Sequence, residues 1–140
     1  MSFTGNYSCN TLRSGLINGS IDFSTDTFFL ALYTNAATLD QNTTQYTSAG
    51  EASGGTYSPG GLQVNATVGT QATPSGSIVF VDFSSPSWTG QITARGALIY
   101  KAGANGAICV LDFGNDKTSN IAFTVQMPAN NSTSALIRLG

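Results

Sequence analysis

The feature that most constrains the fold of this 140-residue chain is a series of short apolar or alternating runs, each closed by a turn-forming cluster. Such runs have the length and period of β-strands, whereas α/β proteins place long helical segments between their strands. The predicted strands cover residues 28–33, 51–57, 62–68, 78–83, 92–101, 107–113, 121–127 and 135–139. Seven or eight strands without intervening helices predict an all-β fold, an antiparallel β-sandwich of jelly-roll or Greek-key type.

The connection between residues 92–101 and 107–113 gives the clearest local signal, because it ends in Asn105-Gly106. Asparagine and glycine tolerate positive φ angles better than other residues do. An Asn-Gly pair between two apolar runs therefore indicates a β-hairpin. We predict that these two strands are antiparallel neighbours.

The segment before the first predicted strand follows a helical period instead. Its apolar side chains recur at spacings that share one helical face: Cys9, Leu12, Leu16 and Ile17. Asn6 or Ser8 could cap the start of a helix, and Gly19 stands where a left-handed stop residue would lie. We predict one amphipathic helix at about residues 7–18, with its apolar face on a sheet or on a neighbouring subunit.

By its length the chain is a single domain. Residues 1–19 would form an N-terminal arm or helix, and residues 20–140 the β-sandwich. Within the sandwich, residues 34–61 are mostly polar and contain Gly54-Gly55 and Pro59-Gly60-Gly61. Apart from an irregular strand near residues 51–57, this stretch is predicted to be a long loop.

Charged residues are scarce, at 9% of the chain with a net charge of −2. The basic residues are scattered along the sequence: Arg13, Arg95, Lys101, Lys117 and Arg138. Nucleic-acid binding draws on clustered cations, and so does a polybasic membrane anchor, so we expect neither partner. The first residues lack the pattern of a signal peptide, and no apolar run has the length of a membrane span. A neutral, polar surface gives little repulsion between molecules and indicates that much of it lies against other protein.

The sequence contains no histidine, the commonest general base and metal ligand. A Ser-Lys pair would have to use Lys101 or Lys117, both near predicted turns. Asp82 and Asp112 occupy matching positions on two strands and could serve a glycosidase only if they met in space. A strand-end aspartate more often bonds backbone amides or pairs with an arginine. We therefore predict no catalytic residues and no enzymatic activity.

Metal and cofactor sites receive equally little support. Asp112, Asn115 and Asp116 offer oxygen ligands, but their spacing fits no recognised calcium loop. The glycines of residues 34–61 do not open a helix in a βαβ unit, so they do not indicate a phosphate-binding loop. Unusual φ angles at turns explain them better. We predict no metal ligands and no cofactor-binding residues.

Three further side chains carry expectations. Cys109 lies within an apolar run far from Cys9, so we expect a buried free thiol rather than a disulfide framework. Arg95 lies in the middle of a strand between small neighbours. It could lie flat and reach a carboxylate or a partner chain, or it could point outward without a partner; the sequence leaves both interpretations open.

Many strand and turn sequences resemble those of a group of tailed-bacteriophage virion proteins: residues 26–34, 37–39, 43–47, 50–54, Tyr57, Gly60-Gly61, Asp82-Phe83, Pro86, Trp88, 93–100, 111–114 and Asp116-Lys117. The similarity runs from about Gly19 to the end and includes no catalytic signature, so no functional residue is carried over. It implies a small jelly-roll cement or decoration protein on the capsid exterior. Proteins of that kind bridge major capsid protein subunits and oppose the internal pressure of the DNA.

We therefore expect a capsid cement protein whose partners are the major capsid protein and further copies of itself, as a homodimer or homotrimer. It would be found in the host cytoplasm during assembly and then on the virion. The N-terminal segment and residues 34–61 are the candidate contact surfaces.

Two alternatives remain at this point. The same sandwich could belong to the neck, tail or fibre of the virion. It could also be a carbohydrate-binding module, since jelly rolls host lectins. Such a module would need several exposed aromatic rings as a stacking platform: Tyr33, Tyr46, Tyr57, Trp88 and Tyr100.

Overall fold

The computed structural model describes residues 6–74, 76–127 and 136–139. Its one helix is α1 (Asn10–Asn18). Its strands are β1 (Tyr7–Ser8), β2 (Phe28–Tyr33), β3 (Leu62–Val64), β4 (Ala66–Thr73), β5 (Gly76–Phe83), β6 (Ser87–Thr89), β7 (Thr93–Lys101), β8 (Ala107–Thr118), β9 (Ala122–Thr124) and β10 (Ile137–Leu139).

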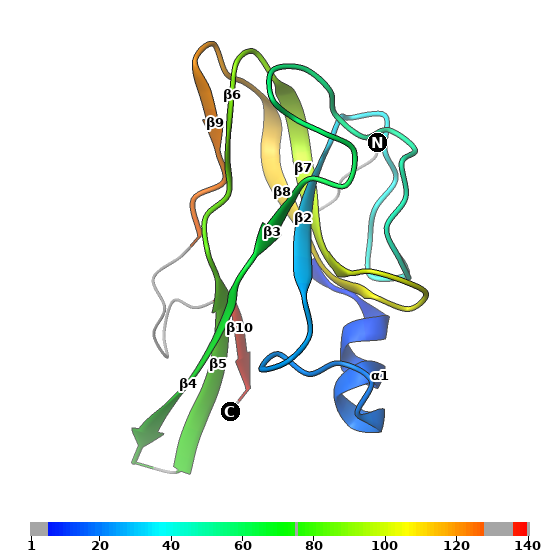
Figure 1. Cartoon of the computed structure of the whole chain (residues 1–140). Helices are drawn as coiled ribbons and strands as arrows, with labels where there is room; N and C mark the ends of the chain where they lie inside the picture. Colours follow the sequence, from blue (N-terminus) through cyan, green and yellow to red (C-terminus); the bar gives the residue numbers. More distant parts are fainter. Residues whose placement is uncertain (1–5, 75, 128–135, 140) are drawn as a thin grey trace.

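The strands form two layers, shown in Figure 1. The first layer is a five-stranded sheet in the order β1-β8-β7-β2-β3. The second combines the three-stranded group β10-β5-β4 with the pair β6-β9, because β6 follows β5 in the chain after a short connection. Every pairing is antiparallel. The predicted all-β antiparallel sandwich with one short N-terminal helix is therefore confirmed.

The main core lies between the layers and collects inward side chains from both: Leu30, Leu32, Val64, Phe83, Trp88, Ile92, Ile99, Ile108 and Phe123. The opposite face of the first sheet carries a second cluster, in which Ala31 and Tyr33 meet Ala37 and Leu39 of the long loop. Strand β2 is thus buried on both faces, as its unbroken apolar sequence predicts.

The predicted hairpin is present as β7 and β8. Asn105 has a φ angle of 59°, and the Lys101 amide donates to the Gly106 carbonyl at 2.7 Å across the turn. The register between the strands shifts between Ala94 and Gly96, so Arg95 lies at a bulge. The Asn-Gly pair therefore marked the turn correctly.

Helix α1 begins later than predicted, because residues 7–8 pair with β8 as β1 instead. Neither predicted cap holds: Cys9 occupies the N-cap position and makes no capping bond with its side chain. Gly19 ends the helix with a φ angle of 81°, as predicted. Cys9 and Leu12 are buried and Leu16 packs partly against the main core, but Ile17 is 89% exposed, so the predicted apolar face is confirmed except at Ile17. No helix among the described residues has the length and apolarity needed to cross a membrane.

The run at residues 62–68 is split at Asn65, where the chain leaves the first layer as β3 and enters the second as β4. Val64 is buried, but Leu62 is 39% and Val68 49% exposed. The prediction of one continuous strand over residues 62–68 is therefore wrong. A change of sheet alters which face each side chain meets, and residue alternation does not reveal it.

Two other strand predictions need correction. Residues 51–57 contribute only an isolated bridge, from Glu51 to Tyr33, because that stretch turns at Gly54-Gly55. Strand β6 was not predicted, since three residues after a Ser-Ser-Pro turn are too few to show a period. The predicted break at Pro128 and Asn130-Asn131 lies outside the described residues.

Candidate docking surface

The two predicted contact surfaces are joined in the structure. The Asn10 amide, at the start of α1, donates to the Gln41 carbonyl at 2.8 Å, and its side chain donates to Asn42 Oδ1 at 3.0 Å. On the other side, the Ala107 amide of β8 donates to the Thr44 carbonyl at 3.0 Å. We call α1 and residues 34–61 together the loop–helix surface.

The loop is held on the first sheet along its length. Its inward side chains Ala37, Leu39 and Ala52 are buried. The Ala52 amide donates to the Leu32 carbonyl of β2 at 2.9 Å. Buried apolar side chains and a paired amide therefore hold this irregular segment against the first sheet.

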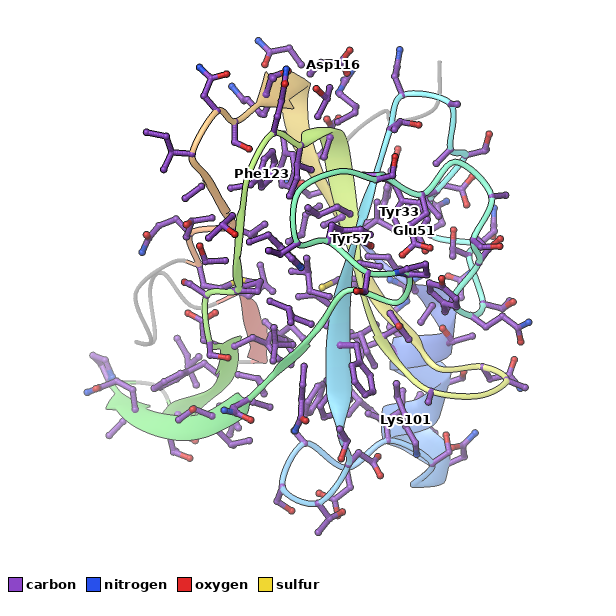
Figure 2. The ribbon with its side chains drawn as sticks, turned by 45° about the horizontal axis from the view of Figure 1, so that its top comes forward. Tyr33, Glu51, Tyr57, Lys101, Asp116 and Phe123 are labelled. Atoms are coloured by element: carbon purple, nitrogen blue, oxygen red, sulfur yellow. The ribbon has the colours of Figure 1, made fainter. Side chains whose placement is uncertain are left out.

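A single carboxylate organises the loop from within. Glu51 Oε1 accepts the Tyr46 hydroxyl at 2.5 Å. Glu51 Oε2 accepts the Tyr57 hydroxyl at 2.5 Å and the Gly60 amide at 2.7 Å. Figure 2 shows Glu51 and Tyr57 gathered beside Tyr33. Hydrogen bonds to a charged acceptor are the stronger kind, so these three donors hold distant parts of the loop to one point.

The tyrosines of this network stay protonated over the ordinary pH range. Burial, followed by the hydrogen bond to Glu51, raises the pKa of Tyr46 to about 12. The same two causes, burial first, raise the pKa of Tyr57 far above its usual value. Burial raises the pKa of Tyr100 to about 12. Because these hydroxyls remain neutral, they keep donating their hydrogen bonds, and the network holds the loop together over this pH range.

The aromatic platform expected for a carbohydrate-binding module is not formed. Tyr33, Tyr57, Trp88 and Tyr100 are buried, with exposures between 0% and 8%. Tyr46 is half-buried and stacks on Tyr100 with ring centroids 4.9 Å apart. These rings fill the interior and the underside of the loop, which leaves them no shared face toward solvent.

The outer face of the loop is polar and uncharged. Its exposed residues are Asn35, Ala36, Thr38, Gln41, Asn42, Thr44, Gln45, Ser48, Ala49, Ser53, Gly54, Gly55, Thr56, Ser58 and Pro59. The loop's two acidic side chains are both partly buried, and Asp40 accepts the Asn42 amide at 2.8 Å. Helix α1 adds one cation, Arg13, which donates to Ser8 and Asn10.

Glycines permit the loop to approach the sheet closely. A Cβ on Gly61 would lie 1.8 Å from the Leu30 carbonyl oxygen, and its φ angle is 78°. A Cβ on Gly50 would lie 2.6 Å from the backbone of Ala37. Gly54, Gly55 and Gly60 also have positive φ angles, so the prediction of unusual φ angles at these turns is confirmed.

Arg95 has a partner within its own chain. Its Nε lies 3.1 Å from Asp112 Oδ1, and both side chains are 12% exposed. Asp112 also accepts the Gly114 amide at 2.8 Å. Of the two alternatives for Arg95, the structure shows the one in which it reaches a carboxylate. Asp112, one of the conceivable calcium ligands, is therefore already engaged by Arg95. The described residues contain no group of three or more histidine, cysteine, aspartate or glutamate side chains placed to hold a metal.

Asp82 and Asp112 have separate surroundings. Asp82 is buried on β5 in the second layer, whereas Asp112 is on β8 in the first. Asp82 Oδ1 accepts the Phe83 amide at 2.9 Å, and Oδ2 has no hydrogen-bond partner in the described part of the chain. Burial raises the pKa of Asp82. One aspartate bonds an amide and the other pairs with an arginine, the arrangement that the sequence favoured.

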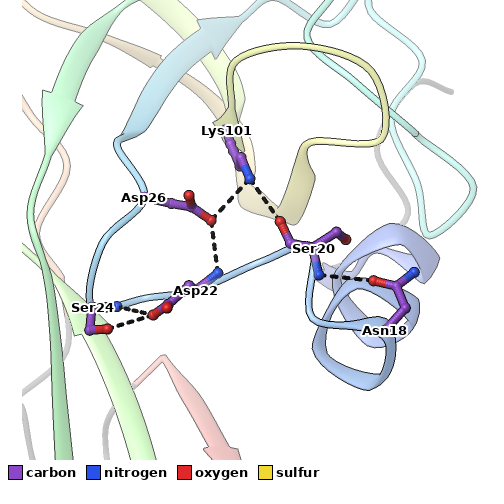
Figure 3. Close-up of polar contacts among 6 residues, drawn as sticks. All are labelled: Asn18, Ser20, Asp22, Ser24, Asp26 and Lys101. Carbon is purple, nitrogen blue, oxygen red and sulfur yellow. Dashed lines mark hydrogen bonds and ion pairs between the residues drawn. The ribbon is translucent and has the colours of Figure 1, made fainter.

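Lys101 links two segments of the chain through the polar contacts drawn in Figure 3. Its Nζ contacts Asp26 Oδ2 at 3.0 Å and the Ser20 backbone carbonyl at 2.7 Å. Asp26 also accepts the Asp22 amide at 2.8 Å, which together with Lys101 lowers the pKa of Asp26. Lys101 therefore ties the segment after α1 to the end of β7 and donates to a carbonyl rather than to a serine hydroxyl. Lys117 is exposed on β8.

Cys9 and Cys109 are both buried free thiols, as expected for Cys109. Burial raises the pKa of Cys9 to about 11 and that of Cys109 further still. Because the thiolate is the reactive form, these residues behave as small apolar side chains.

The role of Glu51 was not predicted from the sequence. The only available signal was that Glu51, the sole glutamate of the chain, stands between Tyr46 and Tyr57 in an otherwise polar loop. No protein-family model matches this chain, and neither a curated protein nor a solved structure matches it significantly.

Proposed function

We propose that this chain is a non-enzymatic virion structural protein, a capsid cement protein that bridges major capsid protein subunits on the particle exterior. The observation that carries the proposal is the loop–helix surface. It joins the two predicted contact regions into one polar face that is anchored from within by Glu51. The resemblance to phage virion proteins supplies the identity of the partner.

An anchored surface suits repeated docking on a protein lattice. Binding costs less ordering entropy when the contact loop is already fixed before the encounter. Several such contacts on one oligomer act together, because each engaged site raises the effective concentration of the next. The exposed loop residues carry no charge, so docking would depend on shape and hydrogen bonds. We therefore expect the affinity to change little with salt concentration.

The direct test is electron microscopy of particles of the phage that encodes this chain. We expect density for the sandwich on the outside of the shell, with residues 34–61 toward the major capsid protein. Density only at the neck, tail or fibre would overturn the proposal in favour of the alternative. Copy number separates the two independently, with hundreds per particle expected on the shell.

A binding measurement on isolated shells tests the surface itself. Gln45→Glu places a charge on the exposed face of the loop without a change of shape. We expect the affinity for shells to fall by about tenfold, since a buried unpaired charge opposes binding. Gln126→Glu makes the same change at an exposed position outside the loop–helix surface and should leave binding unchanged. Equal losses from both variants would contradict this choice of surface.

A further inference from the structure

The second layer ends in a long strand that has a partner on one side only. Strand β4 (Ala66–Thr73) pairs with β5 over all eight of its residues and with no other strand among the described residues. The edges of the first sheet are much shorter, with two residues in β1 and three in β3. In an antiparallel ladder every second residue of an edge strand directs its amide and carbonyl outward. About four residues of β4 are therefore available for further pairing.

This edge lacks the features that usually prevent edge-to-edge association. Proteins protect edge strands with lysine, proline, a bulge or an inward charge. The sequence of β4, ATVGTQAT, has no charged residue and no proline. Its pairing with β5 runs without a register shift. Thr67, Val68 and Thr70 are all exposed.

An apolar strip continues from this edge over the face of the layer. Val68 is 49% exposed, and Val79, on the neighbouring strand, is 38% exposed. Both line an open groove of about 440 Å³ whose other walls include Leu16, Phe23 and Ile137. In Figure 1 the β4–β5 hairpin extends away from α1 at this end of the sandwich. A strand added beside β4 would cover the outer side of Val68.

We propose that β4 pairs antiparallel with β4 of a second copy of this chain, so that the two second layers join into one continuous sheet. A second copy fits because a two-fold axis makes two identical edge strands run antiparallel, and β4 has no charged residue that any register could set against its like. An uncharged strand alone avoids like-charge repulsion in that arrangement. The pairing gives the proposed cement protein its oligomer, and it leaves the loop–helix surface of each copy free to dock.

The test uses the purified full chain, so its outcome does not depend on whether the chain binds capsids. Sedimentation velocity over a range of concentrations should show a dimer for the unchanged protein. Val68→Lys should shift the dimer dissociation constant upward by at least about tenfold, since a lysine on an edge strand opposes pairing with another strand. Thr70→Lys, at a second exposed position of the same strand, should do the same.

Ile121→Lys is the matched control. Ile121 is 83% exposed and lies before β9, so this change removes a more exposed apolar side chain and adds the same charge. Dimerisation should be unaffected. If Ile121→Lys weakens the dimer as much as Val68→Lys does, the association comes from general surface hydrophobicity and the proposal is wrong. A monomer at every concentration also overturns it, and urea unfolding of each variant confirms that it is folded.

Cysteine cross-linking gives a second readout. Single substitutions at Thr67, Thr70 and Gln71 should yield an intermolecular disulfide at the position nearest the two-fold axis and little elsewhere. The native thiols are buried and contribute little background. Asn120→Cys, exposed and outside β4, should not cross-link. A dimer that cross-links at none of the three β4 positions uses another surface, and that result contradicts the assignment.

Discussion

The loop of residues 34–61 and the β4–β5 hairpin differ in a way that secondary structure alone does not suggest. The loop is irregular, yet its apolar side chains are buried and its polar groups bond to the sheet and to Glu51. The hairpin is regular, yet among the described residues β4 pairs on one side only, and a valine on each of its strands is exposed. The order of a segment is determined by how completely its side chains and backbone groups are satisfied, and regular geometry is only one way to achieve this.

The same contrast holds for one carboxylate from each region. Glu51 in the loop accepts three hydrogen bonds. Asp82 in the hairpin accepts the Phe83 amide, while Oδ2 lacks a partner in the described part of the chain. Glu51 is thus held by donors from three places in its loop, whereas Asp82 is buried with fewer hydrogen bonds.

Gly61→Ala should be the most damaging single change. The new methyl group would collide with the Leu30 carbonyl, and the positive φ angle of this position disfavours any side chain. We expect a loss of more than about 3 kcal/mol in the free energy of unfolding, measured by urea denaturation. Gly103→Ala is the control, because its φ angle is 100° but the space around it is open. It should lose only about 1–2 kcal/mol; equal losses would mean that the loop does not press on β2.

Glu51→Gln should weaken the loop without removing its backbone contacts. The charged acceptor of three hydrogen bonds becomes neutral, and one of its oxygens becomes a donor. We expect a loss of about 2 kcal/mol together with faster hydrogen exchange at the amides of residues 46–60. Asp116→Asn neutralises an exposed carboxylate, placed at the end of β8 and apart from the loop in Figure 2, and should change stability by less than about 0.5 kcal/mol. If hydrogen exchange of the loop amides is unchanged in Glu51→Gln, then Glu51 does not anchor the loop.

Asp82→Asn should alter how stability depends on pH. Burial raises the pKa of Asp82 in the folded protein above its ordinary value of 3.8. Between 3.8 and that raised value the folded state binds more protons than the unfolded state, so this group makes stability fall as pH rises. Asparagine does not titrate and can still accept the Phe83 amide. The stability of the unchanged protein relative to Asp82→Asn should therefore decrease from acidic to neutral pH.

Urea unfolding of both proteins across that pH range provides the measurement. A difference that stays constant, or that grows in favour of the unchanged protein as pH rises, would show that Asp82 is well solvated or paired. In that case the contrast with Glu51 would not hold.

Gln71→Lys should have the smallest effect on the isolated fold. Gln71 is exposed on β4, and a charge there meets only solvent in the monomer. We expect a change within about 0.5 kcal/mol at concentrations where the protein is monomeric. A large loss under those conditions would mean that another part of the monomer covers the β4 edge.

The fold was largely accessible from the sequence, for identifiable reasons. The unbroken apolar run at Phe28–Tyr33 predicted a strand buried on both faces, and Asn105-Gly106 predicted the β7–β8 hairpin. The failures occurred where three-dimensional context overrode local pattern. Asn65 gives no local sign that the chain changes sheets there, and Ile17 fits the helical period although nothing among the described residues covers it.

The candidate surface was accessible only in part. Its two components were recognised as contact regions, but their adjacency depends on hydrogen bonds between residues 31 and 32 positions apart along the chain. The role of Glu51 depends likewise on which hydroxyls the folded loop brings to it. Contacts of this kind follow from long-range topology and leave no local signature.

The sequence by itself determined the composition of the surface and the class of the fold, because charge content and strand periodicity are properties of local residues. It also limited the chemistry available to the chain, which has no histidine. The folded structure alone shows which loop lies against which strand and that Arg95 pairs with Asp112. It alone also shows that β4, rather than β1 or β3, is the long edge strand among the described residues. Those outcomes depend on how two sheets close over a shared core, and that closure is a property of the whole chain.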